Sequence, residues 1–369
     1  MYAVVIRLVA LLSALVSFHL TTELAFAGEP GSDCGTPSDI HDGWMIGSPE
    51  QQGFDPALLC AMGKGVADGK LADVDSVVVI RHGVLVYERY FLYPDREFFD
   101  ATMTHVGNSM TKSVVSLLVG IAMDRGLIKD LDTPIFSYFP EYADLGTPGK
   151  DRITLRHLLT MSSGLNASAP EPTVRHSHDP YRHALAMTLA RDPGASFEYS
   201  NMGTELIGAI LQKVSGKPVD ILAQENIFAP LGINDADWYG RLGNGVPMSS
   251  AGLRLRPRDW AKIGQLVLNQ GLWEGKQIVS GSWIAQSTTA HLKARGRFSY
   301  GFQWWLGRSS SGDRVVEWPA AMGSNGQKTI ILPELDTVVV FIASHDSINM
   351  VRPEIELLDR YILPAILKH

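Results

Sequence analysis

Ser109 and Lys112 stand three positions apart in the stretch Ser109-Met110-Thr111-Lys112. On a helix, residues i and i+3 lie on the same face, so the Lys112 amine can approach the Ser109 hydroxyl. A serine hydroxyl is a poor nucleophile until a base takes its proton. Burial and the positive start of a helix both disfavour a charged lysine, so Lys112 can act as that base. The spacing predicts a serine nucleophile with a lysine partner, and the alternative is a capping serine beside a solvated lysine.

A second motif, Tyr199-Ser200-Asn201, offers further partners for the same chemistry. The Tyr199 phenol could reach the Ser109 proton and relay it to a leaving group. The Asn201 amide could orient Lys112 or a substrate carbonyl. Ser-x-x-Lys and Tyr-x-Asn each occur once in the 369 residues. Together they predict acyl transfer with Ser109, Lys112 and Tyr199 as catalytic residues and Asn201 as a supporting residue.

A long buried helix is expected to hold the nucleophile. The sequence predicts this helix from Ser109 to about Arg125, with Gly126 as the left-handed residue that ends it. A helix that is apolar on nearly all sides is buried on most of them. The apolar positions are Val114, Val115, Leu117, Leu118, Val119, Ile121 and Ala122.

Strand patterns occur at both ends of the chain, with helical patterns between them. Residues 76–87 predict a β-hairpin around the turn Arg81-His82-Gly83. Residues 327–332 and 337–343 predict two strands joined by Pro333-Glu334-Leu335-Asp336. The sequence therefore predicts an α+β fold, in which one antiparallel sheet forms from both termini, is flanked by helices, and receives a mainly helical insertion. The predicted helices are 56–69, 155–161, 202–214 with Asn201 as N-cap, 257–269 and 354–367.

The first residues are predicted to be a targeting segment. Arg7 precedes an apolar stretch from Leu8 to Val16, and Ala25-Phe26-Ala27 is a small-x-small site before Gly28. This pattern is typical of a secretory signal peptide over residues 1–27 and predicts a periplasmic or secreted protein. The alternative is an uncleaved N-terminal anchor.

The rest of the chain is expected to form an irregular lead-in over residues 28–50 and a hydrolase domain over 51–369. A helical subdomain is predicted at roughly 125–300. No segment after the signal is apolar enough to cross a bilayer. The formal net charge is −7 and lysines and arginines are scattered, so no basic field favours a nucleic-acid partner.

Cysteine and histidine usage gives no cofactor or metal motif. A bridge between Cys34 and Cys60 that pins the N-terminal segment is possible, and so are two unrelated thiols. His176, His178 and Asp179 could hold a metal ion, but no third ligand has convincing spacing and a solvated loop is the simpler interpretation. We therefore predict neither a metal nor a cofactor.

With these motifs in this order, the chain from about Trp44 onward resembles the serine β-lactamase-like superfamily. That superfamily includes class C β-lactamases, D,D-peptidases, related esterases and 6-aminohexanoate-dimer hydrolases. The resemblance implies a β-lactamase/transpeptidase-like fold and an acyl-enzyme mechanism, with Ser109 as nucleophile and Lys112 and Tyr199 as base partners. The segments that carry the resemblance are 107–113, 153–165, 198–201, 252–259 and 332–336.

The third motif of the family is Lys-Thr-Gly or His-x-Gly on an edge strand. The matching stretch here is Gly323-Ser324-Asn325-Gly326-Gln327, so Ser324 stands where the family has a cation. In family β-lactamases this cation helps to hold the substrate carboxylate, and its absence weakens a β-lactamase assignment. The resemblance implies an oxyanion hole from the backbone N–H groups of Ser109 and Gln327, with the second donor open within 324–327. The candidate pocket residues are Tyr181, Ser324, Asn325, Gly326 and His345, and Trp304 and Trp305 could line an acyl pocket.

The sequence thus predicts an exported serine hydrolase that cleaves a small-molecule amide, ester or peptide through a Ser109 acyl-enzyme. An amidase of the 6-aminohexanoate-dimer hydrolase kind or a carboxylesterase fits the missing cation best. The enzymatic alternative is a β-lactamase or D,D-peptidase. The alternative from another class is a receptor with slow turnover that binds peptidoglycan fragments or β-lactams.

Overall fold

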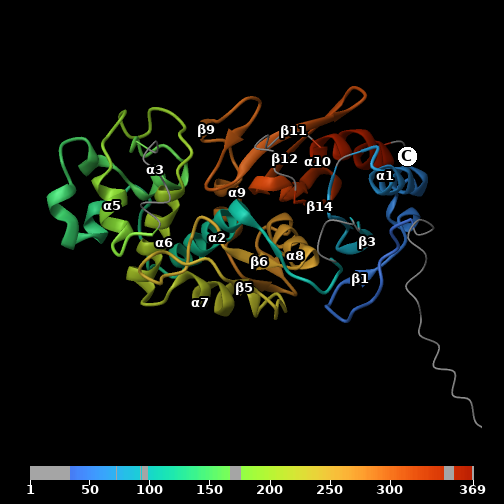
Figure 1. Ribbon diagram of the computed structural model, residues 1–369, viewed down its shortest axis with the longest axis horizontal. Coiled ribbons are helices and arrows are strands. Elements are labelled where there is room, and N and C mark those ends of the chain that lie inside the picture. Colours follow the sequence, from blue (N-terminus) through green and yellow to red (C-terminus); the bar gives the residue numbers. More distant parts are fainter. Residues whose placement is uncertain are drawn as a thin grey trace, which may run out of the picture. The chain divides into compact units, whose positions relative to one another are not determined.

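A nine-stranded sheet assembled from both ends of the chain is the main feature of the computed structural model, which describes residues 34–71, 73–91, 93, 99–166, 176–344 and 353–367 (Figure 1). The strand order is β1-β3-β2-β14-β13-β12-β11-β10-β9, and every pair is antiparallel except β1 with β3. The strands are β1 Met45–Ile46, β2 Ser76–Arg81, β3 Val84–Tyr90, β9 Leu292–Lys293, β10 Ser299–Tyr300, β11 Trp305–Ser311, β12 Arg314–Met322, β13 Lys328–Leu332 and β14 Thr337–Ile342.

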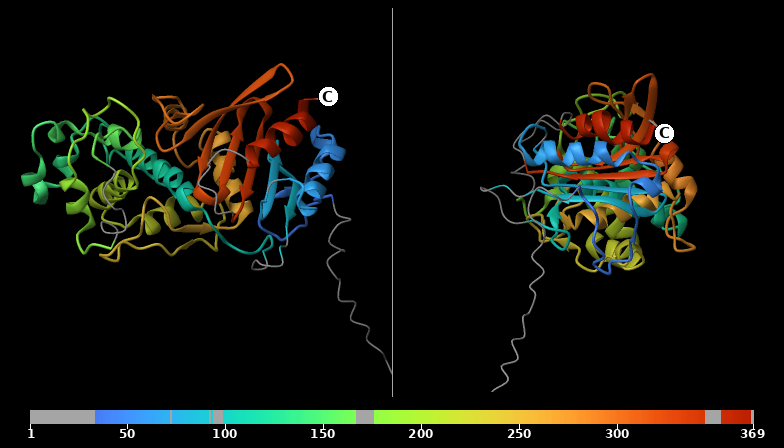
Figure 2. Two further views of the ribbon diagram at one scale, coloured as in Figure 1. Left: turned by 45° about the horizontal axis from the view of Figure 1, so that its top comes forward. Right: turned by 90° about the vertical axis from the view of Figure 1, so that its right-hand side faces the viewer.

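Helices cover both faces of this sheet because its central strands are apolar on both sides. Side chains alternate between faces along a strand. Val77 and Val79 belong to a core with α1 (Pro56–Ala67) and the C-terminal helices, whereas Val78 and Ile80 belong to a core with α8 (Pro257–Leu268). Figure 2 shows α1 and the C-terminal helices on one face, in blue and red. The C-terminal helices are α10 Pro353–Leu357, the π-helical turn η9 Leu358–Ile362 and α11 Leu363–Leu367.

The middle of the chain is mainly helical, and α2 (Thr111–Asp124) is buried within it. All its residues from Thr111 to Ala122 are buried. Gly120 allows close packing, because a Cβ there would lie 2.3 Å from the Trp283 ring. The helices that surround α2 or pack beside its neighbours are α3 Leu155–Leu159, α5 Pro180–Ala186, α6 Asn201–Ser215, α7 Val219–Ala223 and α9 Gly281–Ser287.

Short elements complete the fold. A small sheet, β4-β6-β5, pairs His105 with Leu255 and so brings the residues before Ser109 beside those after Ser250. Its strands are β4 His105–Val106, β6 Leu253–Leu255 and β5 Asp237–Trp238, and a separate hairpin pairs β7 Leu272–Trp273 with β8 Lys276–Gln277. The short helical turns are η1 Glu50–Gln52, η2 Asn108–Met110, η3 Ile135–Tyr138, η4 Pro140–Leu145, η5 Lys150–Arg152, η6 Gln224–Phe228, η7 Ser324–Gly326 and η8 Pro333–Leu335.

The predicted α+β fold and its sheet from both termini are confirmed. The hairpin turn between β2 and β3 is His82-Gly83, where φ is 51° and 73°, as a two-residue hairpin turn requires. The β13–β14 hairpin turns at residues 333–336, and Asp336 is left-handed with φ 45°. Between β10 and β11 the chain turns at Gln303, which is left-handed with φ 64°.

Two local predictions about the catalytic motifs were wrong by small shifts. The helix predicted from Ser109 begins at Thr111, and Ser109 lies in the 3-10 turn η2 before it. Helix α6 begins at Asn201, and its N-cap is Ser200, whose hydroxyl accepts a hydrogen bond from Gly203 N at 3.0 Å. Asparagine and serine are equally good caps. The Asn201 side chain has a different partner, described below.

The N-terminal part of the described chain is fastened at two points. Cys34 and Cys60 form a disulfide, which ties the lead-in to α1. Arg258, which is fully buried, donates to Glu88 on β3 and to Ser38 O at 2.7 Å. These contacts fix residues 34–44 against the sheet, and no free cysteine occurs among the described residues.

Candidate active site

Ser109 and Lys112 lie side by side where η2 passes into α2. The Lys112 Nζ atom is 3.0 Å from Ser109 Oγ. It also donates to Asn201 Oδ1 at 2.6 Å and to the Ser250 carbonyl oxygen at 2.8 Å. Lys112 is only 1% exposed. The i, i+3 spacing therefore produces the predicted contact, and α6 and the segment before β6 add two more partners.

The three contacts of Lys112 determine how it can exchange a proton with Ser109. The oxygens of Asn201 and Ser250 are carbonyl-type acceptors, so each must receive an N–H from Lys112. The remaining position on the nitrogen faces Ser109 Oγ. An ammonium group donates its third proton there, whereas a neutral amine presents its lone pair to the serine hydroxyl. The geometry suits transfer of the Ser109 proton to Lys112.

The Tyr199 ring lies beside Lys112. Its ring centroid is 4.9 Å from Lys112 Nζ, a cation–π distance. The ring stacks on Trp305 with centroids 6.0 Å apart and an interplanar angle of 22°. Trp305 also contacts Phe197 and Phe298 edge-on, and it is 2% exposed. Tyr199 is thus held between the lysine and an aromatic cluster.

The stretch 323–327 lies against the nucleophile turn, but not on an edge strand as predicted. It forms the turn between β12 and β13, both inside the sheet. A Cβ on Gly323 would lie 2.4 Å from Gly107 O, so only glycine permits this approach. Asn108 Nδ2 donates to Ser324 O at 3.0 Å. The turn is therefore fastened directly beside Ser109.

Gln327 follows this turn and is 1% exposed. Its side-chain amide donates to Ala343 O, which anchors it to the end of β14. Its backbone N–H makes none of the backbone hydrogen bonds found in the turns and loops of the described residues. A backbone N–H next to a reacting serine can stabilise a developing oxyanion.

Asn108, immediately before Ser109, has a left-handed backbone with φ 48°. Asparagine adopts this conformation more readily than most residues. The Asn108 carbonyl accepts from Thr111 Oγ1 at 2.7 Å, which supports the turn. Asn108 therefore has two structural roles that the sequence motif does not reveal. Its side chain holds the 323–327 turn, and its carbonyl oxygen supports the start of α2.

Gln303 links the elements that carry the two motifs, and the sequence analysis missed it. Its carbonyl oxygen accepts from Ser113 Oγ on α2 at 2.8 Å. Its side-chain oxygen accepts from Thr204 Oγ1 on α6 at 3.0 Å, and its amide donates to Leu159 O at 3.0 Å. The one sequence signal for this role is the position of Gln303 as a polar residue between Phe302 and Trp304.

The remaining predicted pocket residues lie on two different elements. Tyr181 lies on α5, where burial raises its pKa and Glu205 is a charged neighbour. Ser324, Asn325 and Gly326 form η7, next to Asn108. His345 lies outside the described residues. Within the described ranges, no three metal-binding side chains gather as a metal ion would require.

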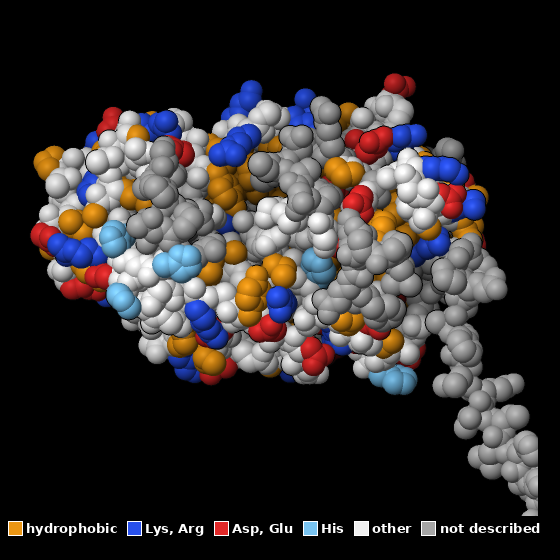
Figure 3. Space-filling model, viewed as in Figure 1, with side chains coloured by type: hydrophobic (Ala, Val, Ile, Leu, Met, Phe, Trp, Pro, Cys, Tyr) orange, Lys and Arg blue, Asp and Glu red, His pale blue; other side chains and the backbone are white. Residues whose placement is uncertain are grey.

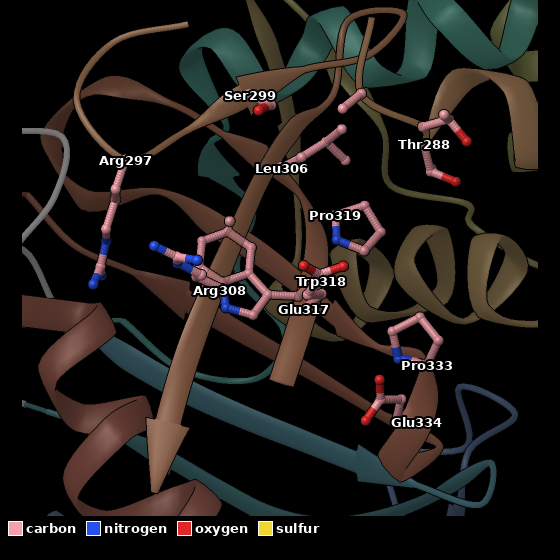
Figure 4. Close-up of a pocket in the computed structure, with 13 residues that line it drawn as sticks. Thr288, Arg297, Ser299, Leu306, Arg308, Glu317, Trp318, Pro319, Pro333 and Glu334 are labelled. Atoms are coloured by element: carbon pink, nitrogen blue, oxygen red, sulfur yellow. The ribbon is translucent and has the colours of Figure 1, made fainter. Parts of the chain in front are cut away.

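A separate cavity of about 550 Å³ lies against β11 and β12 (Figure 4). Leu306 and Pro319, opposite each other on β11 and β12, contribute to it together with Arg297, Arg308 and Glu317. Its lining residues do not include Ser109, Lys112, Tyr199, Asn201 or Ser250. Its volume is in the range of ligand pockets, and its charged side chains Arg297, Arg308 and Glu317 are exposed.

On the face drawn in Figure 3, lysines and arginines are interspersed with acidic residues. No helix in the described ranges combines the length and the hydropathy needed to cross a membrane.

Comparison with known proteins gives consistent matches. The sequence model of the family described as Beta-lactamase matches residues 66–362. A 6-aminohexanoate-dimer hydrolase from Paenarthrobacter ureafaciens is 24% identical over 298 residues, which are 73% of this chain and 72% of that protein. Esterase EstB from Burkholderia gladioli is 27% identical over 212 residues, 51% of this chain and 53% of that esterase. A penicillin-binding protein homolog from Caulobacter crescentus has the same fold, with a TM-score of 0.69, 18% identity, and coverage of 86% and 98% of the two chains.

Proposed function

This chain belongs to the beta-lactamase family, as its sequence motifs predicted, and from this membership we propose that it hydrolyses esters or amides through a covalent acyl-enzyme on Ser109. The observation that carries the proposal is the 3.0 Å contact between Lys112 Nζ and Ser109 Oγ. Lys112 has its other two hydrogen-bonding positions occupied by carbonyl oxygens, so the contact with Ser109 is directed rather than incidental.

In the acylation step, the neutral Lys112 amine takes the Ser109 proton while Oγ forms a bond to the substrate carbonyl carbon. The carbonyl π electrons move to its oxygen. The backbone N–H groups of Ser109 and Gln327 are our candidates to stabilise this oxyanion. When the carbonyl re-forms, the bond to the leaving alcohol or amine breaks. The leaving group takes a proton from Tyr199 or Lys112.

In the deacylation step, a water molecule attacks the acyl carbon and gives up a proton to whichever of Tyr199 and Lys112 had protonated the leaving group. The ester bond to Ser109 breaks, the acid leaves, and Oγ takes back its proton from the Lys112 ammonium. Tyr199 suits this relay because its ring lies against Lys112 and is held in place by Trp305. Each group therefore ends the cycle in its starting protonation state.

Two features support a neutral substrate with an apolar acyl group. Position 324 carries a serine instead of a cation, so the turn offers no charge to pair with a substrate carboxylate. On the other side, Tyr199 borders the aromatic cluster of Phe197 and Trp305. An amidase like the 6-aminohexanoate-dimer hydrolases or a carboxylesterase fits these features best. β-Lactamase or D,D-peptidase activity is the enzymatic alternative.

The test is intact-mass spectrometry after brief exposure to a fluorophosphonate, to nitrocefin and to a p-nitrophenyl ester. We expect a fluorophosphonate adduct at Ser109 and turnover of the ester. Turnover of nitrocefin instead would favour the β-lactamase alternative. A lasting acyl adduct without turnover would favour a slow receptor, and no adduct at Ser109 would refute the proposal.

We also propose that the protein is exported, with cleavage after Ala27. The Cys34–Cys60 disulfide supports this proposal, because such bonds persist mainly in oxidising compartments. The measurement is the N-terminal mass of the protein recovered from its cell fraction. A mature chain that begins at Gly28 is the expected result, and an intact Met1 in the cytosol would contradict it.

A further inference from the structure

Glu205 is a buried carboxylate near Lys112. It lies on α6 four residues after Asn201, so the two side chains leave the same face of the helix. Glu205 is 1% exposed. A carboxylate at such depth is costly unless its oxygens accept hydrogen bonds. Its partners therefore indicate why the helix contains it.

The partners of Glu205 are two consecutive backbone N–H groups. Ser249 N donates to Oε2 at 2.7 Å, and Ser250 N donates to Oε1 at 3.0 Å. Burial raises the pKa of the Glu205 carboxyl, while the hydrogen bonds from Ser249 and Ser250 and the charge of Lys112 oppose that rise. One carboxylate thus fixes the orientation of two adjoining peptide groups.

The same segment supplies a partner to the candidate base. The Ser250 carbonyl oxygen accepts from Lys112 Nζ at 2.8 Å. Two of the three acceptors around Lys112 therefore depend on α6. Asn201 contributes its side chain directly, whereas the Ser250 carbonyl is held through Glu205.

We propose that Glu205 is a positioning residue that keeps the Ser250 carbonyl in place, and thereby directs the third position of Lys112 Nζ at Ser109 Oγ. This inference rests on the proposed function of Ser109 and Lys112. Glu205 itself does not touch the reacting atoms, and it acts through the Ser249–Ser250 backbone.

A carboxylate suits this position because two N–H donors stand side by side. Glutamine has nearly the same shape but only one acceptor oxygen, so its NH₂ group would face the second donor. Aspartate keeps both oxygens and the charge but is one methylene shorter. Glu205→Gln therefore tests the charge and the number of acceptor oxygens, whereas Glu205→Asp tests the length of the side chain.

Glu205 also contributes a charge near Lys112. The titratable groups that face Glu205 are Lys112 on α2 and Tyr181 on α5, and Tyr199 faces Lys112 from the turn before α6. Removing the negative charge of Glu205 makes the protonated form of Lys112 less favourable. The acidic limb of the Ser109 acylation rate should then move to lower pH, a change that a purely architectural role would not cause.

The experiment measures the rate of Ser109 labelling by a fluorophosphonate across a pH series, on the full chain, with the folded fraction taken from circular dichroism. We expect Glu205→Gln to label up to about 100-fold more slowly, because a displacement of about 1 Å can cost that factor. The acidic limb should also shift to lower pH. Glu205→Asp should lie between Glu205→Gln and the wild type in rate and keep the wild-type limb.

The matched control is Glu88→Gln. Glu88 is another buried carboxylate, which lies on β3 and accepts a hydrogen bond from Arg258 on α8. Its folded fraction should label at the wild-type rate. Equal rates and pH profiles for Glu205→Gln and wild type would overturn the inference. If Glu205→Gln does not fold, a wild-type rate for Glu205→Asp overturns it, and a reduced rate with a wild-type melting curve supports it. Failure of the wild type to label at Ser109 would instead refute the proposed function.

Discussion

The Lys112 amine and the Ser250 carbonyl oxygen lie 2.8 Å apart, although 138 positions separate the two residues in the sequence. The pairing of β4 with β6 makes this contact possible, because Gly107 N donates to Leu253 O at 2.9 Å just beyond the strand ends. The small sheet thus helps to position Lys112, the proposed base. The Ser-x-x-Lys motif provides the side chains, and a distant backbone provides their orientation.

Lys112→Ala should reduce ester hydrolysis about as strongly as Ser109→Ala, within an order of magnitude, because residues that act as a unit lose activity together. Each substitution should cost at least about a thousandfold. The measurement is kcat/KM with a p-nitrophenyl ester, with circular dichroism to verify the fold. Turnover of Lys112→Ala near the wild-type rate would show that another group takes the Ser109 proton.

Gly323→Ala should impair Ser109 labelling without unfolding the protein. The added Cβ would lie 2.4 Å from Gly107 O, so the turn must move away from the nucleophile. A shift of about 1 Å could slow labelling by up to about 100-fold. Gly281→Ala on α9 is the control, because the atom nearest to its added Cβ, Gln270 O, would be 3.4 Å away. Equal labelling by both variants would argue against a contribution of the turn to the site.

Replacing Cys34 and Cys60 with serine should lower the free energy of unfolding by about 3 kcal/mol, the usual value for a loop of this size. The bridge limits the freedom of the unfolded chain and holds the segment that carries Ser38 O to Arg258. Denaturant titration of the double variant measures the change. Fluorophosphonate labelling of its folded fraction should stay at the wild-type rate, and a slower rate would mean that the lead-in affects the site.

His157 should make the protein less stable as the pH falls through 6.5. Burial lowers the pKa of His157 below its ordinary value of 6.5, and its Nδ1 accepts from Thr154 N at 3.1 Å in the capping box of α3. The unfolded state therefore binds the proton first, so stability is lost as pH falls through 6.5 and the loss levels off below the folded pKa. His157→Gln keeps an acceptor and does not titrate. Melting temperatures from pH 7.5 to 5.5 should fall more steeply for the wild type, and parallel curves would contradict this prediction.

The parts of the site that lie close in sequence were predictable. The contact between Ser109 and Lys112 follows from i, i+3 spacing, and turn residues such as His82-Gly83 indicated the hairpins correctly. The cap of α6 was misplaced by one residue because Ser200 and Asn201 both suit that role. Local patterns therefore predicted the main hairpins and helices and the contact between Ser109 and Lys112.

Contacts made by the backbone could not be predicted. A carbonyl such as that of Ser250 has no residue type that distinguishes it from any other, and Gln303 and Glu205 act on backbone groups that are distant in the sequence. The third motif was expected on an edge strand, but the order of the strands depends on pairing between distant segments. Such pairing follows from the packing of the whole sheet rather than from the pattern of one strand.

The dependence of the site on both ends of the chain has a consequence for biosynthesis. Asn108 is bonded to Ser324, 216 positions later, and Val79 on β2 lies opposite Val339 on β14. At about 5–20 residues per second, a ribosome needs roughly 10–40 s to add the residues between Asn108 and its partner. During that time the nucleophile has neither its neighbouring turn nor a closed sheet. Ser109 therefore has its complete surroundings only after the C-terminal strands have been synthesised, and we expect a truncated product not to react with acylating compounds.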